Sequence, residues 1–388
     1  DLDSSRGLGD VYKRQVVSSS RDLLTIFIGI ELASTPMFLL SGWKKGDRKS
    51  NEGAIKFFLL GVLSASLILY GFSLIYGLTG QLVFADISAY LLANSLGSSP
   101  VLLLSAILVI SGIGFKISVV PFHSWAPDTY EGAPLPITAY LSVSSKATGF
   151  VALIVLLTKV FESSGQSWGV ILAIVAGATM TLGNLVALQQ TNPVRLLAYS
   201  SISQAGFIIA PLAVSGITGN YQDGIFASVT YLIIYAFMNI GAFLSVHLFT
   251  NFTKSDNFYE WGGIAKHSPL TGVLTTVFFF SLAGIPPLGG WFAKFVVFRS
   301  LLSTGEIIGI SLAIVGAINA VIALVYYARI SKVIWMDELK NPEEEKSFEF
   351  QSPLKVVGAL TVLITFVAGI FPGIFSYLGE VSSIFFGN

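Results

Sequence analysis

The chain is 388 residues long and has the composition of a membrane protein. Hydrophobic residues make up 53% of it and charged residues 11%, and the mean hydropathy is +0.76, whereas a soluble domain carries about 25% charged residues. The formal net charge of +0 gives no reason to expect a nucleic-acid partner, and the lack of cysteine excludes disulfides, thiolate metal sites and cysteine nucleophiles. We therefore expect an all-α polytopic membrane protein that lies in the lipid bilayer.

The N-terminal segment differs from the rest of the chain. Residues 1–15, DLDSSRGLGDVYKRQ, are polar, begin without methionine and lack the apolar stretch that a signal peptide needs. We expect residues 1–20 to be a non-family or artefactual lead-in on a chain whose native N-terminal part lies outside this sequence. A natural, disordered N-terminus is the alternative.

Apolar runs of about 20 residues, the length that crosses a bilayer, recur from residue 22 onward. They predict about ten transmembrane helices, at 22–42, 54–78, 101–120, 136–160, 168–189, 195–215, 225–250, 271–300, 307–335 and 354–379. The connections are short, and the longest polar one, at 335–353, carries charges of both signs and is expected to form a solvated lid.

Positively charged residues concentrate in alternate connections. Lys44, Lys45, Arg48 and Lys49 follow the first predicted span, Arg195 the fifth, Lys254 and Lys266 the seventh, and Lys332, Lys340 and Lys346 the ninth. The other connections contain little beyond Lys159 and Arg299. Because basic loops stay on the cytoplasmic side, we expect the first span to enter from the outside and the C-terminus to lie outside.

Two of the predicted spans contain helix-breaking residues. The third has Gly112, Gly114 and Pro121, and the eighth has Gly284, Pro286, Pro287, Gly289 and Gly290, a combination that no unbroken helix accommodates. Irregular backbone at membrane depth is tolerated only where protein or water covers it. Interrupted helices at corresponding places in two halves of a chain indicate a transport site.

Four charged residues stand out within the predicted spans. Glu31, Lys116, Lys146 and Lys294 lie there, and a lysine at the bilayer centre costs about 2.5–3.5 kcal/mol. We expect Glu31 to pair with a lysine rather than to stay protonated. Alternatively, the side chains of Lys116 and Lys294 extend to the membrane interface, which is called snorkelling. Lys146 lies too deep in its span to do so. Lys56 follows the basic loop closely and is either interfacial or a weaker member of the same set.

Desolvated lysines can give up and regain a proton, so these residues form a hypothetical proton relay. Polar side chains in the spans could hold water between them, although each alone is equally a helix–helix contact: Ser142, Ser144, Ser145, Ser200, Ser201, Ser203, Gln204, Tyr231, Tyr235 and Asn239. His123, His247 and His267 are scattered, so we expect no metal site, and we interpret Asp128 and Glu131 as turn and cap residues. No nucleotide-binding or hydrolase motif occurs.

The segment HSWAPDTYEGAPLPITAYLSVSSKATGF, from His123 to Phe150, resembles the proton-translocating membrane subunits of respiratory complex I, specifically the subunit N (subunit 2) family. Further matches are ELASTPMFLL at 31–40, NPVRLLAYSSISQAGF at 192–207 and FFFSLAGIPPLGGWFAKF at 278–295. The resemblance implies a fourteen-helix fold with two inverted five-helix repeats, of which this chain holds the last ten helices. It divides the chain into a truncated first repeat at 21–160, a second repeat at 161–335, and a cytoplasmic loop with the last helix at 336–388.

The resemblance also implies roles for the charged residues. Glu31 and Lys116 would form an input switch, Lys146 the central relay, and Lys294 the exchange with the outer face, with Lys56 matching a further lysine of the family. At Ser145 the family often has proline. NADH, FMN, iron–sulfur clusters and quinone are expected on partner subunits, with no cofactor and no metal on this chain.

The implied function is proton translocation as a subunit of NADH:quinone oxidoreductase. Its partners would be the other complex I membrane subunits, and its place the bacterial inner (plasma) membrane. The alternatives are a subunit of a multisubunit sodium/proton antiporter, a ferredoxin-linked relative of complex I, or a scaffolding subunit that has lost transport.

Overall fold

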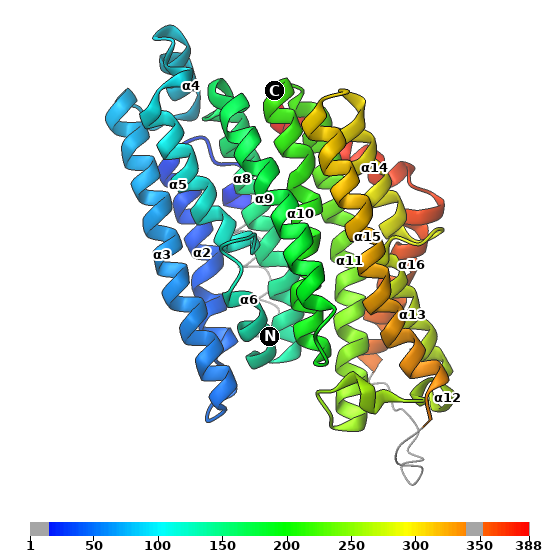
Figure 1. Cartoon of the computed structure of the whole chain (residues 1–388). Coiled ribbons are helices and arrows are strands. Elements are labelled where there is room, and N and C mark those ends of the chain that lie inside the picture. The colour runs from blue at the N-terminus through cyan, green and yellow to red at the C-terminus, as the bar shows by residue number, and fades with distance from the viewer. Residues whose placement is uncertain (1–14, 339–351, 388) are drawn as a thin grey trace.

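The computed structural model describes residues 15–338 and 352–387 and consists of packed helices (Figure 1). The long helices are α2 (Leu23–Ser41), α3 (Arg48–Thr79), α5 (Pro100–Ile117), α8 (Lys146–Lys159), α9 (Gly165–Ala187), α10 (Pro193–Thr218), α11 (Tyr221–Thr253), α13 (Pro269–Ala283), α14 (Gly289–Ser303), α15 (Ile307–Met336), α16 (Ser352–Ile370) and α17 (Gly373–Gly387). Shorter helices are α4 (Phe84–Ala93), α6 (Trp125–Gly132), α7 (Leu135–Tyr140) and α12 (Ile264–His267). Residues 1–14 of the predicted lead-in lie outside the described residues.

The described residues contain eight helical segments long and apolar enough to cross a membrane, or nine if the bent pair α16–α17 is one span. The eighth predicted span, at 271–300, is present as the two shorter helices α13 and α14. The expected all-α polytopic architecture is confirmed. The sequence did not predict α4, which occupies the connection between α3 and α5.

Both predicted helix breaks are present. Helix α5 ends at Ile117 with Ser118 in the left-handed conformation (φ 60°), and α6 starts after Pro121. Helix α13 likewise ends at Gly284 with φ 97°, and α14 begins two residues after Pro287. A left-handed residue ends a helix because it turns the chain away from the helix axis, and the prolines lack the N–H that would continue it.

One predicted span contains an irregular turn and another is bent. The span 136–160 is present as the continuous span Leu135–Lys159, which contains α7, a π-helical turn at Leu141–Ser145, and α8. Such turns often mark functional sites, and this one lies directly before Lys146. The last predicted span, 354–379, is wrong as a single helix, because α16 and α17 meet at an angle of 84°. Pro372 lies at the bend, where it cannot donate a backbone hydrogen bond.

Helix α10 lies at the centre of the bundle and is almost completely buried. It packs against α9 at very short range, since a Cβ atom on Gly183 or Gly206 would lie 2.7 Å from the facing helix. Small residues allow this approach in membrane proteins. By contrast, α3 and α15 expose many large apolar side chains, as expected for helices that face lipid.

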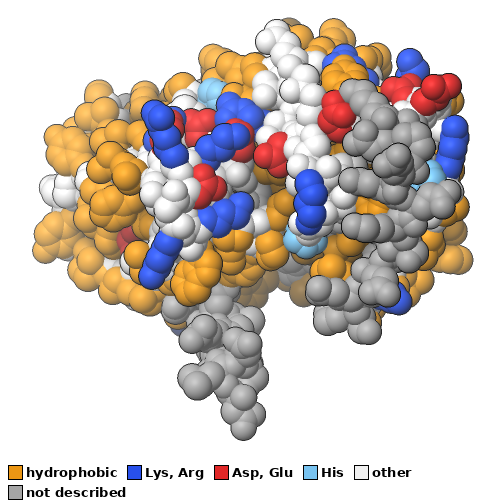
Figure 2. Space-filling view, turned by 90° about the horizontal axis from the view of Figure 1, so that it is seen from below, with side chains coloured by type: hydrophobic (Ala, Val, Ile, Leu, Met, Phe, Trp, Pro, Cys, Tyr) orange, Lys and Arg blue, Asp and Glu red, His pale blue; other side chains and the backbone are white. Residues whose placement is uncertain are grey.

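Charged side chains gather on one end of the bundle, with apolar side chains around the rim (Figure 2). The connections that follow α2, α9, α11 and α15 lie at this end, so the predicted grouping of the basic loops on one side is confirmed for the described residues. Lys340, Lys346 and most of the predicted lid at 335–353 lie outside them. We call this end the charged face.

Gly290 should be intolerant of a side chain, because a Cβ atom there would lie 1.7 Å from the Ser281 carbonyl oxygen. We expect Gly290→Ala to destabilise the packing of α14 against α13 by about 1–3 kcal/mol. Gly77→Ala on α3 is the matched control, since its Cβ would meet no atom within 4 Å. Thermal unfolding of the purified assembly should show a lowered midpoint for the first variant only, and equal midpoints would contradict the packing argument.

Candidate functional site

Glu31 and Lys116 form an ion pair between α2 and α5. The Lys116 ammonium lies 3.0 Å from a Glu31 carboxylate oxygen and 3.0 Å from the Ser34 hydroxyl. Lys116 is 5% exposed and Glu31 is 26% exposed. The lysine therefore does not snorkel to the interface, and its position in the last turn of α5 places it at the negative end of the helix dipole.

Lys146 is the most deeply buried of the three lysines, at 1% exposure. It is the first residue of α8, directly after the π-helical turn. Its ammonium donates to the carbonyl oxygen of Ser201 at 2.9 Å and to the Ser201 hydroxyl at 2.5 Å, both on α10. Neutral oxygen atoms, and no carboxylate among the described residues, thus hold this ammonium.

Lys294 is buried at the second helix break. It extends from α14 towards the end of α13, where its ammonium donates to the carbonyl oxygens of Leu282 (3.2 Å) and Ala283 (2.5 Å). The last carbonyls of a helix have no partner within the helix and carry its negative partial charge. The break therefore creates the site that accepts the lysine. The ammonium also lies 5.2 Å from the centre of the Phe207 ring, a favourable cation–π geometry.

The three lysines are connected through α8 and α10. The Lys116 side chain packs beside Gly149, one turn beyond Lys146, because a Cβ atom on Gly149 would lie 3.3 Å from the Cβ of Lys116. On α10, Gln204 follows Ser201 by one turn and donates to the Leu282 carbonyl oxygen at 3.2 Å. That oxygen also accepts a hydrogen bond from Lys294.

Further polar side chains surround this path. Tyr231 on α11 donates to Gln204, and Ser200 hydrogen-bonds Tyr327 on α15. Asn239 donates to the Ser142 hydroxyl at 2.7 Å, and Tyr235 to its carbonyl oxygen at 3.3 Å. Ser142 belongs to the π-helical turn, so the turn supplies hydrogen-bonding groups beside Lys146.

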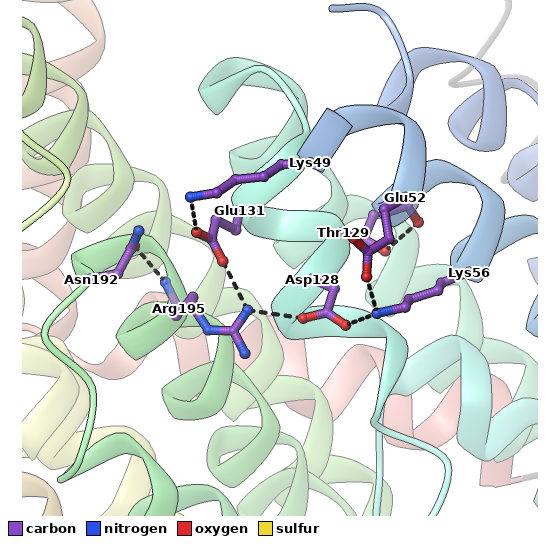
Figure 3. A network of polar contacts seen from close by, with 9 residues as sticks. Lys49, Glu52, Lys56, Asp128, Thr129, Glu131, Asn192 and Arg195 are labelled. Carbon is purple, nitrogen blue, oxygen red and sulfur yellow. Dashed lines mark hydrogen bonds and ion pairs between the residues drawn. The ribbon is translucent and has the colours of Figure 1, made fainter. Parts of the chain in front are cut away.

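A cluster of ion pairs lies at the charged face, between α3, α6 and α10 (Figure 3). We call it the ion-pair cluster, and its members are Lys49, Lys56, Asp128, Glu131 and Arg195. Asp128 binds Lys56 at 2.6 Å and Arg195 at 2.9 Å, and Glu131 binds Lys49 at 2.7 Å and Arg195 at 2.8 Å. Lys56 is thus a surface partner of α6, 43% exposed, and does not contact the buried lysines.

The two carboxylates of this cluster are held ionised by their partners. Burial opposes ionisation of Asp128, but hydrogen bonds from Lys56 and Arg195 outweigh it and lower its pKa. The pKa of Glu131 is lowered in the same way, against burial, by Lys49 and Arg195. This cluster was not predicted from the sequence. The spacing of Asp128 and Glu131 on one face of a helix was the available signal.

The histidines do not form a site. His123 is half-buried in the break between α5 and α6, and His247 pairs with Asn251 on α11. In the part of the chain that the structure describes, no group of three or more His, Cys, Asp or Glu side chains is placed to hold a metal ion.

Comparison with known proteins identifies related chains. Residues 20–322 match the family described as NADH:quinone oxidoreductase/Mrp antiporter, TM. NADH-quinone oxidoreductase subunit N of Heliobacterium modesticaldum is 36% identical over 370 residues, covering 95% of this chain and 74% of that protein. NAD(P)H-quinone oxidoreductase subunit 2 of Crocosphaera subtropica is 41% identical over 363 residues, covering 91% of this chain and 68% of that protein.

Solved structures give the same picture. A chain of respiratory complex I from Thermus thermophilus superimposes with a TM-score of 0.76 at 27% identity, over 95% of this chain and 78% of that one. A chain of the Mrp complex from Dietzia sp. gives a TM-score of 0.84 at 20% identity, over 98% and 77% of the two chains. The second likeness shows the shared fold alone.

The Glu31–Lys116 pair generates a prediction about stability. Removal of one partner of a buried pair leaves an uncompensated group, whereas replacement of both is often close to neutral. We expect Glu31→Gln to lower the thermal midpoint of the purified assembly more than the double variant Glu31→Gln, Lys116→Met does. Additive losses in this double-mutant cycle would show that the two side chains are not coupled.

Proposed function

Because this chain belongs to the NADH:quinone oxidoreductase/Mrp antiporter family of membrane subunits, in its subunit N branch, we propose that Glu31, Lys116, Lys146 and Lys294 relay protons through it. The observation that carries the proposal is that three buried lysines follow one another through packing and hydrogen bonds. Lys116 packs beside Gly149 of α8, Lys146 of α8 contacts Ser201 of α10, and Gln204 of α10 shares a carbonyl acceptor with Lys294. Each is costly in a bilayer. Each also has an oxygen partner that can accept a hydrogen bond from the lysine in both its charged and its neutral form.

As a membrane subunit of NADH:quinone oxidoreductase, the chain belongs to a family whose cofactors reside on other subunits. We place NADH, FMN, iron–sulfur clusters and quinone on those partners, so that redox energy reaches this subunit through contacts with its membrane neighbours. We place the assembly in the bacterial inner (plasma) membrane.

The relay would begin at the Glu31–Lys116 pair. Separation of the pair removes the charge that stabilises the Lys116 ammonium, so the lysine would release its proton towards Lys146, its neighbour across Gly149. Like charges repel strongly where the effective dielectric constant is low. A newly charged Lys146 would therefore favour transfer onward along α10.

The second half of the relay would run along α10 to Lys294. Ser201 holds Lys146, and Gln204 shares the Leu282 carbonyl oxygen with Lys294. Water between these groups would carry the proton, because a backbone carbonyl only accepts hydrogen bonds. Lys294 would then exchange with the outer face along α14.

The sodium/proton antiporter remains the competing function, since the Mrp complex shares the fold. The motif Ala126-Pro127-Asp128-x-Tyr130-x-Gly132-Ala133-Pro134, which resembles the subunit N form, and the subunit N relatives favour the oxidoreductase. Dependence of proton movement on quinone reduction, and its indifference to sodium, would separate the two.

Replacement of Lys116 tests the input step. We expect Lys116→Met in the complete complex to abolish most proton pumping and to slow coupled quinone reduction, because Glu31 loses the group whose charge it controls. Lys159→Met, at the end of α8, is the control. The proposal fails if the Lys116 variant assembles and pumps like the wild type.

Replacement of Gln204 tests the second half. Gln204→Leu keeps the volume but removes the donor that contacts Leu282, so we expect reduced pumping with normal assembly on native gels. Gln189→Leu, at an exposed position after α9, should behave like the wild type. Full pumping by the Gln204 variant would place the path elsewhere.

A further inference from the structure

Helices α6 and α10 pack against each other, and we call their interface the seam. It extends from the ion-pair cluster to the surroundings of Lys146. Arg195 projects from the first turn of α10 and bridges Asp128 and Glu131 on α6 through one guanidinium nitrogen (Figure 3). The three side chains are 28%, 30% and 17% exposed, so they lie at the mouth of the seam. Ser201, which holds Lys146, is six residues further along α10, about 9 Å by helix geometry.

Tyr130 lies between the ion-pair cluster and Ser201. It precedes Glu131 on α6 and is completely buried. Its phenol oxygen lies beside the hydroxyl of Ser201, close enough to interact with it. A buried hydroxyl normally has a partner. Ser201 is the partner within reach of this phenol, so the two hydroxyls lead from α6 to the group that holds Lys146.

The neighbouring seam, between α6 and α3, has the opposite character. A Cβ atom on Gly53 or Gly132 would lie within 2.8 Å of the facing backbone, so the two helices are in direct contact. Above them Trp125 stacks on Phe57 at 4.3 Å and lies 5.2 Å from Phe115. All three rings are at most 4% exposed. An aromatic layer of this kind excludes water.

We propose that protons reach Lys146 from the charged face through the seam between α6 and α10, by way of Tyr130 and Ser201, and that Arg195 closes this seam by bridging Asp128 and Glu131. The inference rests on the proposed function, because it supplies the relay with its proton. In the closed state the bridge ties α6 to α10. When it opens, water reaches Tyr130, whose phenol can both donate and accept a hydrogen bond.

Two substitutions should lower proton pumping but differ in their effect on quinone reduction. Tyr130→Phe removes the hydroxyl but keeps the ring, so proton pumping and coupled quinone reduction should both fall. Arg195→Gln removes the bridge, so quinone reduction should continue while fewer protons are moved per electron. In Arg195→Gln the equilibrium constant for closing the seam should fall about tenfold or more, which corresponds to the loss of one charge-assisted hydrogen bond.

Matched controls distinguish these effects from general damage. Tyr221→Phe makes the same change at the opposite end of the bundle, where the phenol contacts Glu162. Lys44→Gln removes an exposed cation of the charged face that forms no ion pair among the described residues. Both should behave like the wild type. Arg195→Lys keeps the cation and should restore the proton-to-electron ratio.

The experiment measures proton uptake and quinone reduction by inverted membranes that contain the complete complex. The proposal predicts low pumping for Tyr130→Phe, a low proton-to-electron ratio for Arg195→Gln, and loss of the residual proton flux in Arg195→Gln, Lys146→Ala. If Arg195→Gln does not assemble, Asp128→Asn replaces it.

A wild-type result for Tyr130→Phe, or an unchanged proton-to-electron ratio for Arg195→Gln, would overturn the proposal. These outcomes are separable from failure of the relay itself. If Lys116→Met abolishes pumping while the Tyr130 and Arg195 variants are normal, the relay stands and only the access route is wrong.

Discussion

The structure depends on how a bilayer protein holds three buried ammonium groups. Each lysine would be costly in hydrocarbon, and each is stabilised by a different arrangement: a carboxylate for Lys116, a serine for Lys146, and free helix-terminal carbonyls for Lys294. Only the first arrangement contains an opposite charge. The charge of Lys146 and Lys294 is therefore held by neutral dipoles, and such groups can change protonation without leaving a second buried ion unpaired.

The irregular backbone supplies these arrangements. An unbroken α13 would use the carbonyls of Leu282 and Ala283 within the helix, and Lys294 would then have no acceptor. The break after α5 similarly leaves Lys116 in a terminal turn, and the π-helical turn brings Ser142 towards Asn239 and Tyr235. The surrounding regular helices, above all the buried α10, give these interruptions the protein cover that membrane depth requires.

Much of this was accessible from the sequence, because hydropathy and helix-breaking residues act locally. The spans, both glycine- and proline-rich breaks, and the four membrane charges were all predicted, and the structure brings Glu31 and Lys116 together. The π-helical turn and the bend at Pro372 were missed. The turn has no distinctive residue, and a single proline is compatible with a continuous transmembrane helix, as Pro36 in α2 and Pro211 in α10 show.

Contacts between residues far apart in the chain could not be predicted from the sequence. Asp128 and Glu131 looked like turn residues because Arg195, more than 60 residues away, gave no local sign that it would reach them. The contact of Lys146 with Ser201 likewise joins residues 55 positions apart, on α8 and α10. The division into repeats at 21–160 and 161–335 stays a prediction.

The central claim is that the deepest lysine carries the translocated proton, and proton pumping by inverted membranes with Lys146→Ala in an otherwise intact complex tests it most directly. The account predicts loss of pumping and of coupled NADH oxidation while the complex assembles normally, with Lys159→Ala on the same helix unaffected. Unchanged pumping would show that Lys146 is a structural residue, and the chain would then be better explained as a membrane scaffold.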